Sequence, residues 1–274
     1  MTMVYLEDQI AAQDGLQLNV YRWMPEQPAH AALVISHGWS EHAARYHELA
    51  TWFTQQGFEV HALDHRGHGK SEGKRGHVDA WTDYTRDLET LRQTISHEYQ
   101  YILGHSMGGM IAALHLLEYP NRFNAAALSG PAADVSYKVP VLKKLIGKIM
   151  SAWYPSLALK NKVDPNIVCG NPDVVRAYMN DPLNHGLVSA RWFSDYLQQI
   201  ERLKKEAASI RVPVAIWHGE KDELVAPWVG KQLHEGLQCS GKQFHTVENA
   251  LHEILFEQNW QSLAGDMKVW LEQY

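Results

Sequence analysis

Short apolar runs alternate with segments of helical periodicity near the start of the chain. Residues 31–36 are a continuous apolar run, the pattern of a strand buried on both faces of a sheet, and residues 58–63 predict a second strand. Between them the pattern predicts a helix over residues 46–56, ending before Gly57, a residue suited to the C-terminal end of a helix. The order strand, helix, strand predicts a βαβ unit with two parallel strands.

The alternation continues on both sides of this unit. Residues 4–22 predict two strands joined at Asp14-Gly15, because Asp-Gly between alternating apolar positions favours a hairpin. Further strands are expected at residues 101–103, 125–128 and 213–217, and further helices at residues 84–96 and 110–118. Strands that alternate with helices predict an α/β fold with a mostly parallel central sheet flanked by helices.

Between residues 132 and 211 this alternation disappears. The segment is rich in Lys, Pro, Trp and Tyr and has helical patterns. We therefore expect a mainly helical cap at residues 132–211, inserted into a core made of residues 1–131 and 212–274. Within the cap, residues 139–153 repeat apolar positions at helical spacing with lysines between them, so this helix either packs on the core or lies on anionic lipid.

Composition narrows the class of protein. The 274 residues include 45% apolar and 20% charged residues, which is typical of a globular domain. The net charge of -6 includes no basic block, so nucleic acid is not an expected partner. Two cysteines indicate a reducing compartment. The acidic residues near the N-terminus argue against a signal peptide, and no apolar run spans a bilayer. A cytoplasmic protein is expected, with transient membrane contact as an option.

The five residues from Gly104 to Gly108 fit the motif G-x-S-x-G, with Ser106 at its centre. A predicted strand precedes the motif and a predicted helix follows it, which is the context in which such a serine is an exposed nucleophile. A packing serine in a glycine turn is the plainer alternative. We expect Ser106 to be a catalytic nucleophile, and a serine hydroxyl needs an adjacent base.

In the fold that carries this motif, the acid and then the base follow the nucleophile along the chain, on loops after later strands. His252 lies in such a loop and is the expected base. Asp222 follows the strand at 213–217 and is the expected acid that orients it. The alternatives are His234 and His245 for the base, and Glu220 and Glu223 for the acid, all of them better suited to structural or surface positions.

The reaction also needs backbone N–H groups directed at the oxyanion of the tetrahedral intermediate. The residue after the nucleophile, Met107, should supply one such group at a helix N-terminus, and Trp39 should supply the other. The Trp39 side chain is also a candidate wall of the pocket.

These residues resemble the monoacylglycerol lipase and lysophospholipase family of α/β-hydrolases over nearly the whole chain. The matching segments are residues 37–42 (HGWSEH) with Arg45-Tyr46, 64–73 (DHRGHGKSEG), 104–109 (GHSMGG), 181–183 (DPL), 218–222 (HGEKD) and 249–253 (NALHE). The resemblance implies an α/β-hydrolase fold and hydrolysis of an ester between a fatty acyl chain and glycerol, or of a glycerophospho ester, under a cap that covers the acyl chain.

The residues leave several functions open beside monoacylglycerol hydrolysis: a lysophospholipase, a non-lipid carboxylesterase or aminopeptidase with the same triad, and a binding protein on an inactive hydrolase scaffold. In the cap, Tyr154, Trp192, Phe193 and Tyr196 are candidates to line an acyl site or to form the core of the cap.

The proposed chemistry needs no cofactor. The glycines of residues 66–69 lack the spacing of a dinucleotide-binding loop and are interpreted as a structural turn. No paired histidines on a helix accompany His61, His65 and His68, so we expect no metal site.

Overall fold

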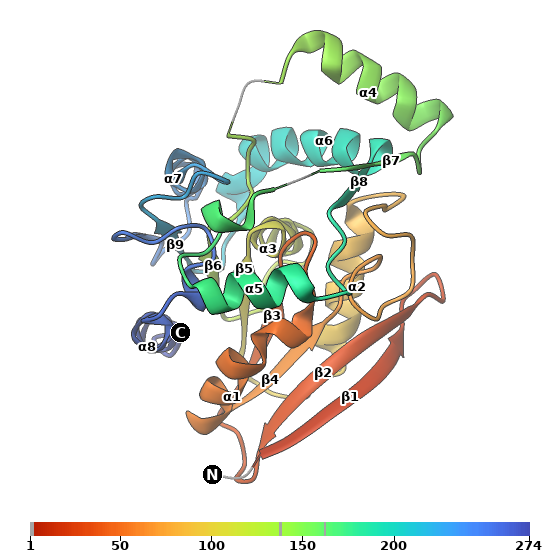
Figure 1. Cartoon of the computed structure of the whole chain (residues 1–274). Helices are drawn as coiled ribbons and strands as arrows, with labels where there is room; N and C mark the ends of the chain where they lie inside the picture. The colour runs from red at the N-terminus through yellow and green to blue at the C-terminus, as the bar shows by residue number, and fades with distance from the viewer. Residues whose placement is uncertain (1–2, 137–138, 162) are drawn as a thin grey trace.

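The computed structural model describes residues 3–136, 139–161 and 163–274 (Figure 1). Its central sheet has eight strands in the order β1-β2-β4-β3-β5-β6-β9-β10. The strands are β1 (Met3–Ala11), β2 (Gln17–Pro25), β3 (Ala31–Ser36), β4 (Phe58–Leu63), β5 (Gln100–His105), β6 (Ala125–Ser129), β9 (Val214–Gly219) and β10 (Gln243–Val247). Strands β1 and β2 run antiparallel to their neighbours, and the pairings from β4 to β10 are parallel. The predicted α/β fold with a mostly parallel sheet is confirmed.

Helices cover both faces of the sheet. The helices of the sheet layer are α1 (His47–Gln55), α2 (Thr82–Gln93), α3 (Met107–Glu118), α7 (Pro227–Gly236) and α8 (Trp260–Leu271). Alternate residues of a strand enter opposite cores: Val34 of β3 joins the cluster that includes residues of α2, α3 and α7, whereas Leu33 and Ile35 join the cluster formed with α1 and α8. The continuous apolar run of β3 is therefore explained by burial on both faces.

The predicted elements differ from the observed ones mainly at their ends. The helix expected at residues 84–96 is α2, which begins at Thr82 and ends at Gln93. It ends early because the N–H groups of Thr94 and Ile95 bond carbonyl groups three residues back, at 2.9 and 3.0 Å, which is a tighter turn than an α-helix. The hairpin is confirmed, with Gly15 at φ 87° in the turn between β1 and β2.

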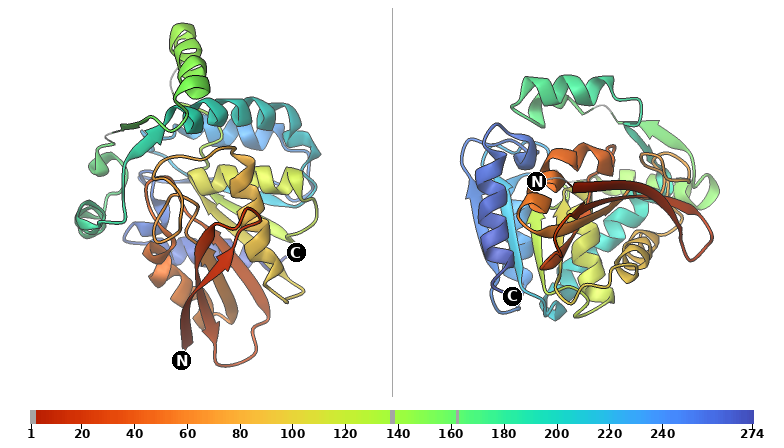
Figure 2. Two further views of the ribbon diagram at one scale, coloured as in Figure 1. Left: turned by 90° about the vertical axis from the view of Figure 1, so that its right-hand side faces the viewer. Right: turned by 90° about the horizontal axis from the view of Figure 1, so that it is seen from below.

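The segment between β6 and β9 contains α4 (Val141–Trp153), α5 (Pro172–Asn180), α6 (Ala190–Glu206) and a two-stranded sheet of β7 (Ala158–Lys160) and β8 (Leu187–Ser189). The small β-sheet was not expected from the sequence. Helix α6 lies next to the sheet layer, and α4 lies on the far side of α6, as both side views show (Figures 1 and 2).

Helix α6 is tied to the core at its first turn. The indole Nε1 of Trp192 donates to the Tyr84 hydroxyl at 3.1 Å, and the indole of Trp81 donates to the Trp192 carbonyl at 3.0 Å. The backbone N–H of Trp81 donates to Asp195 Oδ2 at 2.6 Å. Aromatic packing between Trp81 and Tyr196, with ring centroids 5.1 Å apart, extends this contact along the helix. These bonds fix α6 relative to α2 and its preceding loop.

Helix α4 presents its apolar side chains to solvent. Leu142 is 66% exposed, Leu145 54% and Trp153 77%. The sequence allowed the helix at residues 139–153 either to pack on the core or to lie on anionic lipid. In the structure its apolar face is not buried in the core. No helix of the described chain combines the length and the apolar character that crossing a bilayer requires.

Candidate active site

Ser106 lies in a strained turn between β5 and α3. Its backbone has φ 53° and ψ -116°, a conformation rarely adopted by a residue with a side chain. The flanking glycines do not carry this strain; they allow close packing instead. A Cβ on Gly108 would lie 2.0 Å from the Ser36 carbonyl oxygen, and a Cβ on Gly104 would lie 2.6 Å from the Gly108 carbonyl oxygen. Because both positions lack a Cβ, α3 packs directly on β3 and β5.

Asp222 and His252 meet at the ends of two neighbouring strands. Asp222 follows β9, His252 follows β10, and the parallel pairing of these strands brings their C-terminal loops together. His252 Nδ1 lies 2.7 Å from Asp222 Oδ2. The other carboxylate oxygen of Asp222 accepts the backbone N–H groups of Leu224 and Val225, at 3.0 and 2.8 Å. These bonds hold the carboxylate with one oxygen directed at the imidazole ring.

The second nitrogen of His252, Nε2, is buried and has no hydrogen-bond partner among the described residues. His252 and Ser106 border the same cavity. Gly130 lies beneath the imidazole, where a Cβ would be 3.2 Å from His252 Nδ1. The structure thus brings the expected aspartate and histidine into contact and places the expected serine at the same cavity, with His252 Nε2 not bonded to any other described residue.

Electrostatics favour a charged pair of Asp222 and His252. Burial raises the pKa of the Asp222 carboxyl, but the charge of His252 and hydrogen bonds from His218, His252 and the Val225 N–H outweigh burial and lower it below its usual range. Burial lowers the pKa of His252, yet the Asp222 carboxylate more than offsets this and leaves it above the usual value of 6.5. Asp222 therefore stabilises an imidazolium at His252.

His105 has the opposite character. Its ring lies 4.8 Å from that of His252, measured between centroids, and it is buried. Burial and the charge of His252 lower the pKa of His105 to about 3. A neutral His105, bonded through Nδ1 to the Ser129 hydroxyl at 3.1 Å, adds no second positive charge beside His252.

The rival residues lie elsewhere. His245 lies in β10, bonds to Gln243 at 2.9 Å and stacks on Trp217, and His234 lies in α7. Glu220 accepts the backbone N–H of Asn249 at 2.9 Å on the exposed side of the loop, and Glu223 is exposed. None of these four alternatives borders a described cavity that contains Ser106.

The two expected oxyanion-hole residues flank the serine. Met107 opens α3 directly after Ser106. Trp39 follows Gly38, on which a Cβ would lie 3.4 Å from Ser106 Cβ, so this loop passes against the nucleophile. The Trp39 indole donates to the Leu187 carbonyl at 3.2 Å, which joins the loop to β8, and its side chain also borders the cavities beside Ser106. The roles of the two amides remain predictions.

A large apolar cavity extends from Ser106 toward α4 and α6. Its volume is about 750 Å³, within the range of small-molecule sites. Trp192, Phe193 and Tyr196 line it, and Trp192 and Tyr196 also pack in the buried core, so both arrangements left open by the sequence are present for them. Tyr154 does not: it follows the last turn of α4, is 64% exposed, and does not border the cavity. The structure therefore gives no support for Tyr154 at this cavity, since the end of α4 that carries it faces solvent.

A smaller cavity of about 60 Å³ lies at Ser106 and is bordered by Glu41, Tyr178, Glu253 and Cys169. None of these four residues was expected at the site from the sequence. Arg45 joins Glu41 to Glu253 in a buried ion-pair network. The signals that were available were the four-residue spacing of Glu41 and Arg45 and the position of Glu253 directly after His252.

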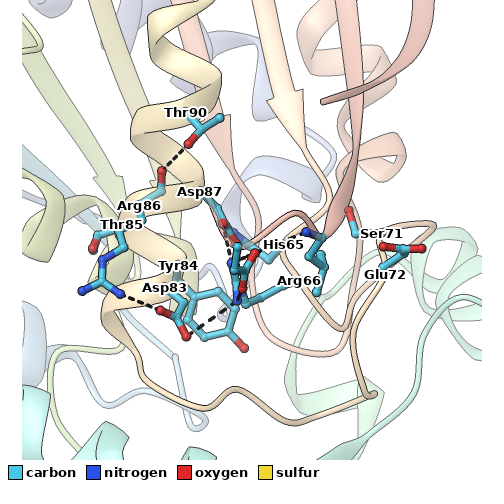
Figure 3. A network of polar contacts seen from close by, with 12 residues as sticks. His65, Arg66, Ser71, Glu72, Asp83, Tyr84, Thr85, Arg86, Asp87 and Thr90 are labelled. Atoms are coloured by element: carbon cyan, nitrogen blue, oxygen red, sulfur yellow. Dashed lines mark hydrogen bonds and ion pairs between the residues drawn. The ribbon is translucent and has the colours of Figure 1, made fainter. Parts of the chain in front are cut away.

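The histidines considered for a metal have packing roles. His65 Nε2 lies 3.0 Å from the Ser36 hydroxyl, and His68 Nδ1 lies 3.1 Å from the Arg66 carbonyl oxygen. Within the described residues, no three His, Cys, Asp or Glu side chains are grouped to hold a metal ion. The loop after β4 is held instead by Arg66, whose guanidinium donates to both oxygens of Asp87 on α2, at 2.6 and 2.7 Å (Figure 3).

An open parallel sheet with a serine at the strand-to-helix turn after β5, and with acid and base on later loops, is the arrangement of the serine hydrolases of the α/β-hydrolase fold. Residues 27–259 match the family described as "Serine aminopeptidase, S33", and the chain belongs to this family.

Individual relatives resemble the chain over most of its length. It is 30% identical to a monoacylglycerol lipase of Mycolicibacterium smegmatis, over 97% of this chain and 96% of the relative. It is 27% identical to a probable lysophospholipase L2 of Haemophilus influenzae, over 86% of this chain and 81% of the relative. The crystal structure of Paleococcus ferrophilus monoacylglycerol lipase superimposes with a TM-score of 0.85 at 30% identity and covers 93% of this chain and 98% of its own.

Proposed function

We propose that the protein is a serine esterase that hydrolyses lipid esters, with monoacylglycerols as its substrates. The observation that carries this proposal is a large apolar cavity of about 750 Å³ that reaches Ser106, where a second cavity of about 60 Å³ is bordered by Glu41 and Glu253 as well as by apolar side chains. A large apolar cavity beside the nucleophile suits the acyl chain of a fatty acid ester. The names of the relatives, monoacylglycerol lipase above all, agree with it.

The proposed mechanism uses the triad expected from the sequence. His252 Nε2 takes the proton of Ser106 as its hydroxyl attacks the ester carbonyl, and the amides of Trp39 and Met107 stabilise the oxyanion. Protonated His252 then gives its proton to the leaving alcohol. Water hydrolyses the acyl-enzyme with the same base. Asp222 holds the imidazole by the 2.7 Å bond to Nδ1 and stabilises its positive charge throughout.

The apolar cavity accounts for the acyl part of the substrate. Residues of α4, β8 and α6 line it together with residues of the sheet layer, so a chain lying there would be covered by the segment between β6 and β9. We propose that residues 132–211 form a cap over a core of residues 1–131 and 212–274. Trp192, Phe193 and Tyr196 would contact the acyl chain.

The smaller cavity favours a neutral alcohol over a charged one. The charged side chains that border it are Glu41 and Glu253, and the guanidinium between them, Arg45, is already paired with both. A phosphate group would lie beside two carboxylates without an unpaired cation, which disfavours a lysophospholipid. An aminopeptidase needs a free carboxylate for the substrate amine, and both carboxylates are occupied. Glycerol, with hydroxyl groups only, fits both constraints.

Exposed apolar side chains on α4 support contact with a lipid surface. Leu142, Leu145 and Trp153 lie on a helix that also carries lysines, and the apolar cavity opens beside this helix. A monoacylglycerol is held in membranes or micelles by its acyl chain. Docking of α4 on such a surface would place the cavity next to its substrate.

The test is the hydrolysis of a 1-monoacylglycerol series from C8 to C18, beside a lysophospholipid and an aminoacyl amide, by the wild type and by Ser106→Ala. We expect the monoacylglycerols to react fastest and Ser106→Ala to lose activity by roughly 10³-fold or more. A fluorophosphonate should label the wild type and leave the variant unlabelled. Turnover of only short or amide substrates would reject the lipid assignment, and lack of labelling would indicate a non-catalytic scaffold.

A further inference from the structure

Three buried charged side chains connect the loop that carries Trp39 with the loop that carries His252. The Arg45 guanidinium contacts Glu41 and also forms a two-pronged bond with Glu253, Nη1 to Oε1 at 2.7 Å and Nη2 to Oε2 at 3.0 Å. The side chains of all three are less than 10% exposed. The rings of Tyr178 and Phe256 lie 4.9 and 4.6 Å from the guanidinium carbon and enclose it.

At one end of this network, Glu41 holds the backbone beside Trp39. Its Oε1 accepts the N–H of Gly38 at 2.5 Å and the hydroxyl of Tyr46 at 2.8 Å. A Cβ on Gly38 would lie 2.7 Å from this oxygen, so only glycine lets the carboxylate approach. The next peptide, which carries the Trp39 N–H, is held through its own carbonyl group, since the Gly38 oxygen lies 2.8 Å from His37 Nδ1. The bond from Glu41 to the Gly38 N–H therefore acts on the backbone directly before that peptide.

At the other end, Glu253 holds the loop of the histidine. Glu253 directly follows His252, and its backbone N–H donates to the Val168 carbonyl at 2.8 Å. Its carboxylate is held by Arg45. Glu253 is thus held through both its backbone N–H and its side-chain carboxylate, and it holds the neighbouring His252 in turn.

We propose that Glu41, Arg45 and Glu253 form a positioning network that keeps the Trp39 amide and the His252 imidazole at a fixed separation across Ser106. This inference rests on the proposed function, in which both groups act on one tetrahedral intermediate. Arg45 is the positioning residue, since it contacts both carboxylates and needs no contact with substrate. Loss of its guanidinium leaves two buried carboxylates without a cation between them, and their repulsion pushes the two loops apart.

The network also sets the charge near His252. Two carboxylates and one guanidinium leave one net negative charge beside the imidazole, in addition to Asp222 on its other side. The neighbouring His105 is neutral, because burial holds its pKa at about 3. Changes at Glu253 should therefore move the pH profile of the reaction, which a purely structural ion pair would not do.

Four variants separate positioning from stability. Arg45→Met removes the guanidinium, and Arg45→Lys keeps the charge but loses the planar two-pronged bond. Glu253→Gln keeps the shape of the side chain and removes its charge. Arg92→Met is the matched control, because Arg92 is similarly buried, also forms a two-pronged bond, to Glu89 of α2, and borders neither cavity at Ser106.

The first measurement is kcat and KM on a monoacylglycerol, with kcat calculated per active site as counted by fluorophosphonate labelling. The second is the affinity for an acyl trifluoromethyl ketone, an inhibitor that forms a tetrahedral adduct with the serine. For Arg45→Met we expect kcat to fall by roughly 10- to 100-fold with KM nearly unchanged, and inhibitor affinity to fall in parallel. Arg45→Lys should recover part of this loss. Glu253→Gln should move the acidic limb of kcat/KM to lower pH, and Arg92→Met should match the wild type.

The proposal is overturned if Arg45→Met has the same kcat per active site and the same inhibitor affinity as the wild type. Equal losses in Arg92→Met would also overturn it, since they would show a general effect of removing a buried ion pair. Ser106→Ala separates this result from the proposed function. If that variant retains turnover, the proposed function fails; if it is inactive while the Arg45 variants are normal, only the positioning network fails.

Discussion

Around the nucleophile, backbone strain and close packing fall on different residues. Ser106 carries the positive φ, a conformation that costs about 1–3 kcal/mol and must be maintained by its surroundings. Gly108 carries the packing, because α3 approaches the end of β3 so closely that no side chain fits there. In this motif the strain therefore lies in the serine backbone. The two glycines are needed because neighbouring backbone atoms leave no space for a Cβ.

Gly108→Ala should destabilise the fold. The added methyl group would lie 2.0 Å from the Ser36 carbonyl oxygen, which belongs to backbone and cannot turn away. We expect the free energy of unfolding to fall by about 1–3 kcal/mol or more, measured by chemical denaturation. Gly265→Ala in α8 is the control, since nothing lies within 4 Å of its Cβ, and it should stabilise the fold slightly. Equal stabilities of the two variants would contradict this explanation of the motif.

Asp222→Asn should change both the rate and its pH dependence. His252 acts as a base in its neutral form, so kcat/KM rises as pH rises through the pKa of His252, which Asp222 holds above 6.5. Without the carboxylate, burial dominates and the rising limb moves to lower pH, while kcat falls by roughly 10⁴-fold. The measurement is kcat/KM against pH on a soluble ester. An unchanged limb would mean that another group titrates.

Only part of this site was accessible from the sequence. Ser106, Asp222 and His252 could be selected because each was expected in a loop or turn that follows a strand, and because their order along the chain is restricted. The pairing of Arg45 with Glu253 was not found, since these residues are 208 positions apart and no local pattern links them. Tyr154 was chosen for its residue type alone, and residue type does not say which way the end of a helix faces.

At the scale of elements, periodicity identified strands and helices better than it identified their ends or their partners. Strands β3 and β4 were predicted over their full lengths, β3 from a continuous apolar run and β4 from its position after the Gly57 helix end and before Asp64. The short strands β7 and β8 were missed, since three residues each are too few to show a period. For α4 the spacing of apolar residues was clear, but spacing cannot distinguish a face that meets protein from one that meets lipid.

Replacing apolar residues of α4 should weaken binding to lipid. We expect Leu142→Asp with Leu145→Asp to lower partitioning into anionic vesicles by at least about tenfold, because the two exposed side chains can no longer enter the bilayer surface. Vesicle co-sedimentation measures this, and hydrolysis of a short soluble ester should stay unchanged. Val269→Asp in α8, at a position 62% exposed, is the matched control. Equal binding of both variants would rule out α4 as the docking element.

At the scale of the whole molecule, the sheet brings distant parts of the sequence to one edge. The loops after β3, β5, β9 and β10 all contribute residues that border the cavities at Ser106 or bond to residues that do. The sequence predicted this convergence, because parallel strands end on the same side. It could not predict the volume of the cavity, which depends on how α4, β8 and α6 are placed over that edge.

Narrowing the apolar cavity should shorten the preferred acyl chain. Val188 of β8 lines the cavity and is partly buried against the core, so Val188→Phe fills space that the chain would otherwise occupy. We expect KM for C16 and C18 monoacylglycerols to rise several-fold, while values for C8 stay close to the wild type. The measurement is kcat and KM across the series. A uniform change at every length would show that the acyl chain lies elsewhere.

The two helices over the cavity are attached to different partners: α6 bonds to the core, whereas α4 bonds to α6, since the Arg191 guanidinium donates to the Ser151 hydroxyl and carbonyl at 2.8 and 2.9 Å. Helix α6 is tied to the core by bonds that involve Trp81, Tyr84 and Asp195, whereas α4 lies beyond α6 with its apolar face exposed. Changes in the residues of α4 that line the cavity would therefore alter the space for the acyl chain without touching the bonds that hold Ser106 and its partners. The residues that contact the acyl chain are therefore different from the residues that perform the reaction. Mutations in evolution could change the range of lipids accepted without altering the catalytic rate.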